Sequence, residues 1–218
     1  KNLQMKLLDG KYISEKLKKQ ITLEAGEVLR NIGRKPHLVA ILVGADGASE
    51  TYVASKIRNC EQVGFKSTLY RYQTNVTEAE LLAKIEEIND DTEVDGLLVQ
   101  LPLPKHIATT KVIETIAPEK DVDGFHPINL GRMQSNLPTY IPATPYGILL
   151  MLDAYQINTV GKHCVVIGRS NIVGSPMSVL MARNANPGNC TVTICHSKTP
   201  DIKKFSLDAD ILVVAIGK

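Results

Sequence analysis

Tyr52 and Lys56 lie four residues apart in the stretch GASETYVASK, residues 47–56. If this stretch is helical, the spacing places the phenol and the amine on the same face, where they could act together in proton transfer. The alternative is that Val53 and Ile57 belong to a core stripe, which Tyr52 and Lys56 merely flank while their polar ends reach solvent.

Further polar residues are expected beside this pair, because ligands of open parallel sheets bind beyond the carboxyl ends of the strands. The apolar run HLVAILVG (37–44) reads as a buried strand that leads into the Tyr52/Lys56 helix. Gln100 ends the predicted strand 94–99, and Asp121 and Asp123 lie in the loop KDVDGF. The alternatives are that Gln100 caps a strand end and that the acidic loop is simply solvated.

A glycine-rich stretch, GRSNIVGSP (168–176), falls between a predicted strand and a predicted helix. Gly168 allows a tight turn, and Gly174 would let the helix start approach a pyrophosphate, whose charge suits a helix N-terminus. Ser170 occupies the position of the middle glycine in the usual dinucleotide pattern. The alternative is a glycine-rich turn without a ligand.

The next predicted strand ends in CHSKT, residues 195–199. An NAD-binding fold normally presents Asp or Glu here to the ribose hydroxyls. This sequence offers His196, Ser197 and Lys198 instead, with Arg169 in the preceding turn. Cationic and hydroxyl groups suit a 2′-phosphate, so NADP is favoured over NAD. An exposed loop at a strand end is the alternative.

Apolar periodicity predicts the elements that would position these residues. Ser49 is the expected N-cap of the Tyr52/Lys56 helix and Gly64 its end, while Thr77 and Glu80 form a predicted capping box. Pro145 suits the first turn of another helix. The predicted helices cover 9–31, 49–64, 77–90, 106–116, 142–157 and the end of 162–184, and the strands 37–44, 66–72, 94–99, the start of 162–184, 189–199 and 209–218.

The alternation of strands and helices occurs twice, which predicts an α/β fold with two parallel sheets flanked by helices around a crevice. We expect a catalytic domain over 1–141 and a Rossmann-like dinucleotide-binding domain over 142–218. A full mononucleotide fold has more strands than the second segment contains, so this domain is expected to be incomplete at Lys218. No internal repeat is apparent.

Composition argues against several classes of partner. The net charge is only +2, which recommends neither nucleic acid nor an acidic membrane surface. No apolar run approaches the roughly 18 residues of a membrane span, and the N-terminal stretch does not resemble a signal peptide. The four cysteines form no C-x-x-C pair, so we expect no metal site and buried free thiols in a reducing, cytoplasmic compartment.

Several motifs occur in one order along nearly the whole chain. They are VGADGASETYVASKIRNCEQVGF, DGLLVQLPLP, PEKDVDGFHPINLGR, IPATPYG and VIGRSNIVGSPM. Together they resemble the bifunctional methylenetetrahydrofolate dehydrogenase/cyclohydrolase family. Gly47 stands where this family usually has Pro, and Ala143 where it usually has Cys, but neither side chain is needed for its chemistry.

The resemblance implies roles for the residues singled out above. Tyr52, Lys56 and Gln100 match the catalytic crevice, and Asp123 matches the carboxylate that anchors the folate. Gly168, Arg169, Ser170 and Gly174 match the dinucleotide turn, to which the charge argument adds Ser197. The resemblance also implies a cytoplasmic homodimer that acts on tetrahydrofolate one-carbon derivatives in one-carbon metabolism and purine biosynthesis.

The implied reaction has two halves. A hydride first leaves 5,10-methylenetetrahydrofolate for NADP, driven by a nitrogen lone pair and helped by orientation. Water then attacks the 5,10-methenyl cation to give 10-formyltetrahydrofolate, and Lys56 is the expected proton acceptor, held by Gln100. Asp123 would accept two hydrogen bonds from the pterin, and Tyr52 would stack on the aminobenzoyl ring.

Two other functions fit parts of the sequence. A Tyr-x-x-x-Lys pair also serves short-chain-type NADP-dependent carbonyl reductases, but there it comes after the glycine-rich turn, whereas Tyr52 and Lys56 precede it in a separate domain. A non-catalytic NADP-sensing module would bind the nucleotide and have no reason to bind a folate.

Overall fold

The computed structural model describes residues 5–217, which divide into two compact units. The first unit is Ser14–Pro127, and the second combines the chain from Ile128 onward with the residues up to Ile13. Helix α1 (Gly10–Ile32) runs through the junction at Ile13. The expected division after residue 141 lies within the second unit and stays a prediction.

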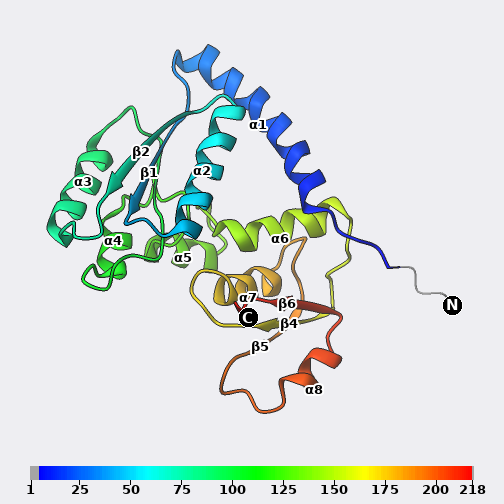
Figure 1. The fold of residues 1–218 in the computed structure, drawn as a ribbon. Helices are drawn as coiled ribbons and strands as arrows, with labels where there is room; N and C mark the ends of the chain where they lie inside the picture. The colour runs from blue at the N-terminus through cyan, green and yellow to red at the C-terminus, as the bar shows by residue number, and fades with distance from the viewer. Residues whose placement is uncertain (1–4, 218) are drawn as a thin grey trace. The chain divides into compact units, whose positions relative to one another are not determined.

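The first unit is a parallel three-stranded sheet with helices between its strands (Figure 1). The strand order is β2-β1-β3, and β1 pairs in parallel with both neighbours. Its remaining elements are β1 (His37–Val43), α2 (Gly47–Gln62), β2 (Lys66–Tyr72), α3 (Glu78–Asp90), β3 (Gly96–Val99) and α4 (Thr109–Thr115). The central strand is buried because apolar side chains pack on both faces of the sheet.

The helix α2 begins earlier than the sequence suggested. Asp46 is its N-cap, and the Asp46 carboxylate accepts a hydrogen bond from the Ser49 N–H at 2.8 Å. The prediction that Ser49 caps the helix is therefore wrong, because Gly47 and Ala48 already form its first turn. The predicted capping box is confirmed: Thr77 and Glu80 exchange hydrogen bonds at the start of α3.

The second unit repeats this architecture with the strand order β5-β4-β6, again entirely parallel. Its elements are α5 (Pro127–Gln134), α6 (Ala143–Ala154), β4 (His163–Ile167), α7 (Gly174–Ala182), β5 (Thr191–Cys195), α8 (Ile202–Leu207) and β6 (Ile211–Val214). The sequence did not predict the short helix α8, and β5 and β6 are shorter than expected. Lys218, the last residue of the expected strand, lies outside the described residues.

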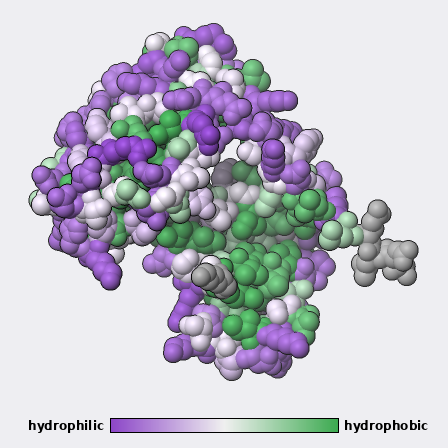
Figure 2. Space-filling model, viewed as in Figure 1, coloured by the Kyte–Doolittle hydropathy of each residue, from purple (hydrophilic) through white to green (hydrophobic). Residues whose placement is uncertain are grey.

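The two faces of the second sheet differ in the residues that cover them. Cys164, Val166 and Val213 point into a core that also contains Met177 and Leu180 of α7. On the other face Leu212 and Val214 are 46% and 59% exposed. Figure 2 shows hydrophobic surface over β6, whereas hydrophilic residues dominate the visible surface of α1 and α3.

All four cysteines are free thiols, as predicted. Cys164, Cys190 and Cys195 are buried and Cys60 is half-buried. Burial, reinforced by the neighbouring Cys190, raises the pKa of the Cys164 thiol to about 12, which makes it unreactive at neutral pH. Among the described residues no group of His, Cys, Asp and Glu could hold a metal ion, and no helix is long and apolar enough to cross a membrane.

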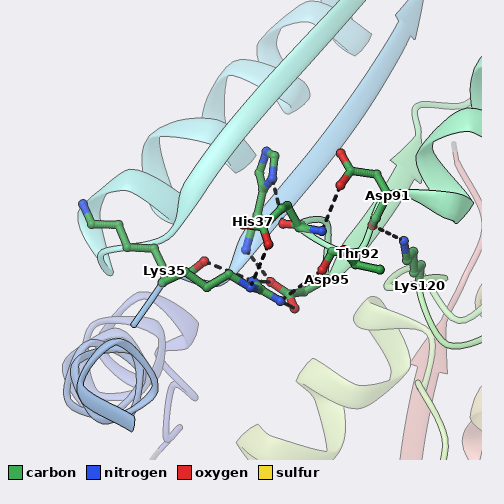
Figure 3. Close-up of polar contacts among 8 residues, drawn as sticks. Lys35, His37, Asp91, Thr92, Asp95 and Lys120 are labelled. Atoms are coloured by element: carbon green, nitrogen blue, oxygen red, sulfur yellow. Dashed lines mark hydrogen bonds and ion pairs between the residues drawn. The ribbon is translucent and has the colours of Figure 1, made fainter. Parts of the chain in front are cut away.

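A histidine braces the start of the central strand in the first unit (Figure 3). His37 Nδ1 lies 3.1 Å from the Glu93 carbonyl oxygen, and Nε2 lies 2.8 Å from Thr68 Oγ1 on β2. The His37 N–H donates to Asp95, which also forms a two-pronged ion pair with Arg34. Because a carbonyl only accepts, Nδ1 carries a hydrogen. His37, Thr68 and Asp95, here called the first bracket, join all three strands.

The second unit has a matching arrangement at the start of β4. His163 Nδ1 lies 3.0 Å from the Asp208 carbonyl oxygen, and Nε2 lies 2.9 Å from Thr193 Oγ1 on β5. The His163 N–H donates to Asp210 at 2.9 Å, and Lys162 lies 3.7 Å from the same carboxylate. We call His163, Thr193 and Asp210 the second bracket; it joins β4, β5 and β6.

Candidate active site

Lys56 and Asp123, which lie 67 residues apart in sequence, meet in the first unit. Lys56 Nζ donates to Asp123 Oδ1 at 3.4 Å, and the side chains are 38% and 19% exposed, respectively. Lys56 projects from α2, and Asp123 lies in the loop that comes after α4. The long distance and partial exposure make this a loose ion pair, which a ligand can take apart at small cost.

The charge on Asp123 is only partly compensated by its neighbours. Burial raises the pKa of its carboxyl above the usual value, and the Lys56 amine opposes this shift without cancelling it. Asp121 adds a smaller upward effect through like-charge repulsion. A half-buried carboxylate whose charge is incompletely balanced is suited to binding a cationic or hydrogen-donating group.

Asp123 occupies the tip of a tight turn, and Asp121 forms its base. Asp121 is only 2% exposed and its Oδ2 accepts the His126 N–H at 2.8 Å. The Gly124 N–H donates to the Asp121 carbonyl oxygen at 3.1 Å. Of the two acidic residues in KDVDGF, Asp121 therefore holds the backbone of the loop, whereas Asp123 pairs with Lys56.

Gln100 comes directly after β3, as predicted for a residue at the carboxyl edge of the sheet. Its backbone N–H donates to the Ile41 carbonyl oxygen on β1 at 2.9 Å, and its Nε2 donates to the Leu101 carbonyl oxygen at 2.7 Å. Within the described part of the chain, the buried Gln100 Oε1 has no hydrogen-bond partner. Such an oxygen is costly unless it accepts a hydrogen bond, so it suits a donor supplied by substrate or by a moving side chain.

Tyr52 lies one helical turn before Lys56 on α2 and is 65% exposed. Its ring is open to solvent, as a stacking surface for a ligand must be. By contrast, Val53 of the same helix is completely buried. The helix thus presents Tyr52 and Lys56 outside its core stripe, an arrangement compatible with both interpretations of the pair.

A small, mostly apolar pocket adjoins Asp123. It is lined by Leu98, Val112, Ile116, Phe125 and the two carboxylates of Asp121 and Asp123, among others. Its volume is about 10 Å³, too small for a small molecule, so these apolar side chains pack against Asp123 and do not form a binding cavity. The same side chains explain the burial that raises the pKa of Asp123.

The second unit contains the glycine-rich turn between β4 and α7. Gly168 has φ +120°, and a Cβ there would meet the Ala215 carbonyl oxygen at 2.5 Å. A Cβ on Gly174 would collide with the backbone at Gly168. Both glycines are therefore required by the close packing of the turn, independently of any ligand.

Ser170 shapes this turn in place of the missing middle glycine. Its Oγ accepts hydrogen bonds from the Val173 N–H at 3.2 Å and the Gly174 N–H at 3.5 Å, at the start of α7. Arg169 is exposed, and its carbonyl oxygen accepts from Ser175 Oγ at 3.2 Å. The exposed guanidinium is available to an anion at the carboxyl end of β4.

The CHSKT stretch forms a second tight turn, after β5. The Lys198 N–H donates to His196 Nδ1 at 3.2 Å, and the His196 N–H donates to Thr199 Oγ1 at 2.9 Å. This places Ser197 and Lys198 on the outside, where both are exposed. Neither turn contains Asp or Glu, so nothing in them repels a phosphate.

Comparison with known proteins shows to which protein family the chain belongs. A family model described as "Tetrahydrofolate dehydrogenase/cyclohydrolase, catalytic domain" matches residues 8–123, and one described as the "NAD(P)-binding domain" of the same enzymes matches residues 142–218. The chain belongs to the tetrahydrofolate dehydrogenase/cyclohydrolase family. The resemblance drawn from the motifs is thereby confirmed, as is the two-domain α/β fold with parallel sheets.

Individual family members agree over almost the whole chain. The bifunctional protein FolD of Cytophaga hutchinsonii is 59% identical over 214 residues, which cover 98% of this chain and 74% of that protein. The crystal structure of FolD from Campylobacter jejuni has a TM-score of 0.93 at 45% identity, covering 98% and 74%. The Trypanosoma brucei enzyme, solved with NADP cofactor and an inhibitor, has a TM-score of 0.90 at 32% identity, covering 96% and 71%.

The structure brings only some of the predicted site residues into contact. Lys56 and Asp123 touch, and Gln100 ends the neighbouring strand, but Tyr52 stands free of this pair on the same helix. The roles of these residues, and those of the glycine-rich turn, stay predictions. The residue types of KDVDGF do not separate Asp121 from Asp123, because both are acidic residues of one loop, and only the resemblance singled out Asp123.

Proposed function

We propose that this chain oxidises 5,10-methylenetetrahydrofolate to the 5,10-methenyl form with NADP and hydrolyses that product to 10-formyltetrahydrofolate. The observation that carries the proposal is the Lys56–Asp123 pair: a base and a carboxylate anchor held together at the carboxyl side of a parallel sheet. Family membership supplies the substrate class. Neither the reductase alternative nor the sensor alternative gains support from these relatives.

Substrate binding would begin at Asp123. The amidine-like edge of a pterin offers two N–H donors, which a carboxylate accepts in a bidentate manner. The Lys56 amine would then lose its partner at Oδ1, because the pterin competes for the same oxygens. The exposed Tyr52 ring would stack on the aminobenzoyl group.

The hydride half of the reaction needs no protein base. The nitrogen lone pair beside the one-carbon bridge expels the hydride, and bound NADP supplies the acceptor. The contribution of the chain to this half is to hold the substrate in a reactive orientation, which is worth several kcal/mol in well-oriented systems. Asp123 and Tyr52 would hold the substrate in that orientation.

The hydrolytic half needs a proton acceptor for the attacking water. Lys56, released from Asp123 by the substrate, would take this proton. Gln100 Oε1, which lacks a partner in the described structure, would accept a hydrogen bond from the amine and hold it in place. The Gln100 carboxamide is itself fixed by the Leu101 carbonyl oxygen.

The exposed cationic and hydroxyl side chains of the second unit suit NADP. Arg169, Ser197 and Lys198 are exposed in two turns without acidic residues, which suits a 2′-phosphate. The N-terminus of α7 would face the pyrophosphate. The NADP-bound trypanosomal relative supports this choice of nucleotide.

The direct test supplies methylenetetrahydrofolate and NADP and monitors the absorbance of the methenyl product together with NADPH. Both signals should rise, and the methenyl signal should then decay as water attacks. A protein that binds NADP but neither binds folate nor turns it over would support the sensor alternative. Oxidation of simple alcohols without folate would support a short-chain-type reductase.

The remaining expectations concern assembly and location. We infer a homodimer, for which size-exclusion chromatography with light scattering is the test, and a cytoplasmic location, which fractionation of the source cells would check. We infer neither nucleic acid nor a membrane surface as a partner, because the net charge is only +2.

A further inference from the structure

We infer that Lys120 is a positioning residue for Asp123, acting through the backbone of the loop that carries it. The inference rests on the proposed function, because it assumes that Asp123 anchors the folate. Lys120 lies three residues before Asp123 in KDVDGF, and it is half-buried rather than solvated.

The Lys120 ammonium group is occupied by three backbone carbonyl oxygens. Nζ donates to Ile88 at 2.9 Å, to Asn89 at 2.7 Å and to Asp91 at 2.7 Å. Figure 3 shows the contact at Asp91. Because an ammonium group has three hydrogens, all of its donors are matched to acceptors. The Lys120 side chain is therefore held in one position by the end of α3 and is not a mobile surface charge.

The three carbonyl groups belong to the C-terminal end of α3. The sequence of α3 itself provides no cation to stabilise this end. The last turn of α3 contains no basic residue, and Asp90 and Asp91 add negative charge where the helix dipole is already negative. Lys120 supplies the missing cation, and it adds a hydrogen bond to the Ile88 and Asp91 carbonyl groups, which also accept the Asp91 and Val94 N–H groups. The end of α3 and the loop thus depend on each other.

Asn89 provides a second tie between the same helix end and the same loop. Its Nδ2 donates to the Thr115 carbonyl oxygen at 2.7 Å, and its Oδ1 accepts the Ala117 N–H at 2.9 Å. These contacts fix the chain just before the loop. Lys120 fixes it again just before the Asp123 turn.

The connection from Lys120 to Asp123 runs through short backbone hydrogen bonds. The Leu97 N–H of β3 donates to the Lys120 carbonyl oxygen at 2.7 Å, and the Val122 N–H donates to the same oxygen at 2.9 Å. The Gly124 N–H closes the turn on Asp121. A shift of Lys120 would therefore move Asp123 relative to β3 and to Lys56.

The test compares Lys120→Met with Lys111→Met. Both substitutions remove one positive charge and keep an unbranched stem, but Lys111 is 63% exposed and its amine pairs with the Glu78 carboxylate. Lys120→Met should raise the folate KM and the Kd for a folate analogue about tenfold, with kcat within about twofold and NADP affinity unchanged. Lys111→Met should leave all four values near wild type.

Hydrogen exchange gives a readout that does not depend on activity. The Val122 and Gly124 amides should exchange faster in Lys120→Met than in Lys111→Met. If Lys120→Met does not fold, Lys120→Gln retains an amide donor and should raise KM several-fold. An unchanged folate KM and Kd in a folded Lys120 variant would overturn the inference and leave Lys120 as a stabilising cap only.

Asp123→Ala separates failure of the inference from failure of the proposed function. If Asp123→Ala weakens folate binding while Lys120→Met does not, only the positioning role is wrong. If neither change affects folate binding, or if wild type binds no folate, the proposed site itself is wrong.

Discussion

The two units of this protein share a scaffold and differ in the residues at the carboxyl ends of their strands. Each has a parallel three-stranded sheet whose first strand lies in the centre. In the first unit, charged and polar side chains lie in the segments that come after the strands. These side chains are Lys56, Gln100 and Asp123. In the second unit, the strand β4 leads into a tight backbone turn that begins at Gly168. Similar sheets thus present polar side chains in one unit and a tight glycine-rich turn in the other, and the functions we propose for the two units differ accordingly.

At the opposite, amino ends of the strands the units are nearly identical. The first and second brackets each use a histidine at the start of the central strand, a threonine on one neighbour and an aspartate before the other. No internal repeat is apparent in the sequence, because the matching residues are single and separated by different spacings. The amino edges of both sheets are therefore stabilised in the same way, whereas the residues at the carboxyl edges, where we propose that the two sites lie, differ.

The largest expected effect concerns the side-chain chemistry of the first unit. Lys56→Met keeps the bulk of the stem and removes the amine, so cyclohydrolase activity should fall roughly 10²–10⁴-fold. Dehydrogenase activity should fall less, since hydride loss needs no base. Both rates are measured on one preparation, with Lys66→Met as a charge-matched control. If Lys56→Met hydrolyses the methenyl compound at the wild-type rate, Lys56 is not the base, and Tyr52 and Lys56 are ordinary surface residues of α2.

The second expected effect concerns the anchor of the same unit. Asp123→Ala should weaken binding of a folate analogue by at least ~1.5–3 kcal/mol, the range for hydrogen bonds to charged groups. NADP affinity should stay nearly constant, because the cofactor turns belong to the second unit. Calorimetry with each ligand checks both statements, and an unchanged folate affinity removes Asp123 from the site.

The two brackets can be compared directly by removing their histidines. His37→Ala and His163→Ala should each lower the free energy of unfolding by about 1–3 kcal/mol, since each leaves polar partners unsatisfied. The loss should be larger for His37, which is 6% exposed, than for His163, whose side chain is 23% exposed. Urea unfolding measures both. His106→Ala, which loses one hydrogen bond to Val76, serves as the milder control.

A smaller effect is expected at the backbone-centred site. Arg169→Ala should reduce the preference for NADP over NAD by about tenfold, as expected for loss of one charge-assisted hydrogen bond to phosphate. Lys203→Ala, which removes another exposed cation of the second unit, should leave the preference unchanged. The ratio of kcat/KM for the two nucleotides is the measurement. A wild type that already prefers NAD would show that the 2′-phosphate assignment is wrong.

The smallest expected effect is a difference between two carboxylates of the first unit, Asp95 and Asp123, in how their ionisation changes stability with pH. The Arg34 guanidinium holds the pKa of Asp95 below its usual value, so its stabilising contribution is present at neutral pH and is lost as pH falls. Burial raises the pKa of Asp123, so its ionisation opposes folding as pH rises. Asp123→Asn should therefore raise the melting temperature at pH 7, and the gain should shrink as the pH falls through the raised pKa of Asp123 and vanish below about 4, the ordinary pKa of an aspartate. A gain that grows on acidification would contradict this sign.

Much of the fold can be predicted from local sequence. The strand β1 is an uninterrupted apolar run, α3 begins with the Thr77/Glu80 capping box, and Pro145 lies in the first turn of α6. Each of these signals acts over a few residues, through periodicity or a short hydrogen bond. The start of α2 could not be chosen locally, because Asp46 and Ser49 are both good N-caps and only the backbone of Gly47 and Ala48 decides between them.

The sequence alone determined the parallel α/β architecture, the candidate residues and the family, because ordered motifs and periodic patterns are visible without coordinates. The tertiary structure alone decided which of these residues touch. The Lys56–Asp123 pair, the three carbonyl contacts of Lys120 and the two brackets join segments 29 to 67 residues apart. Such contacts depend on how strands align and helices pack, and no spacing along the chain encodes them.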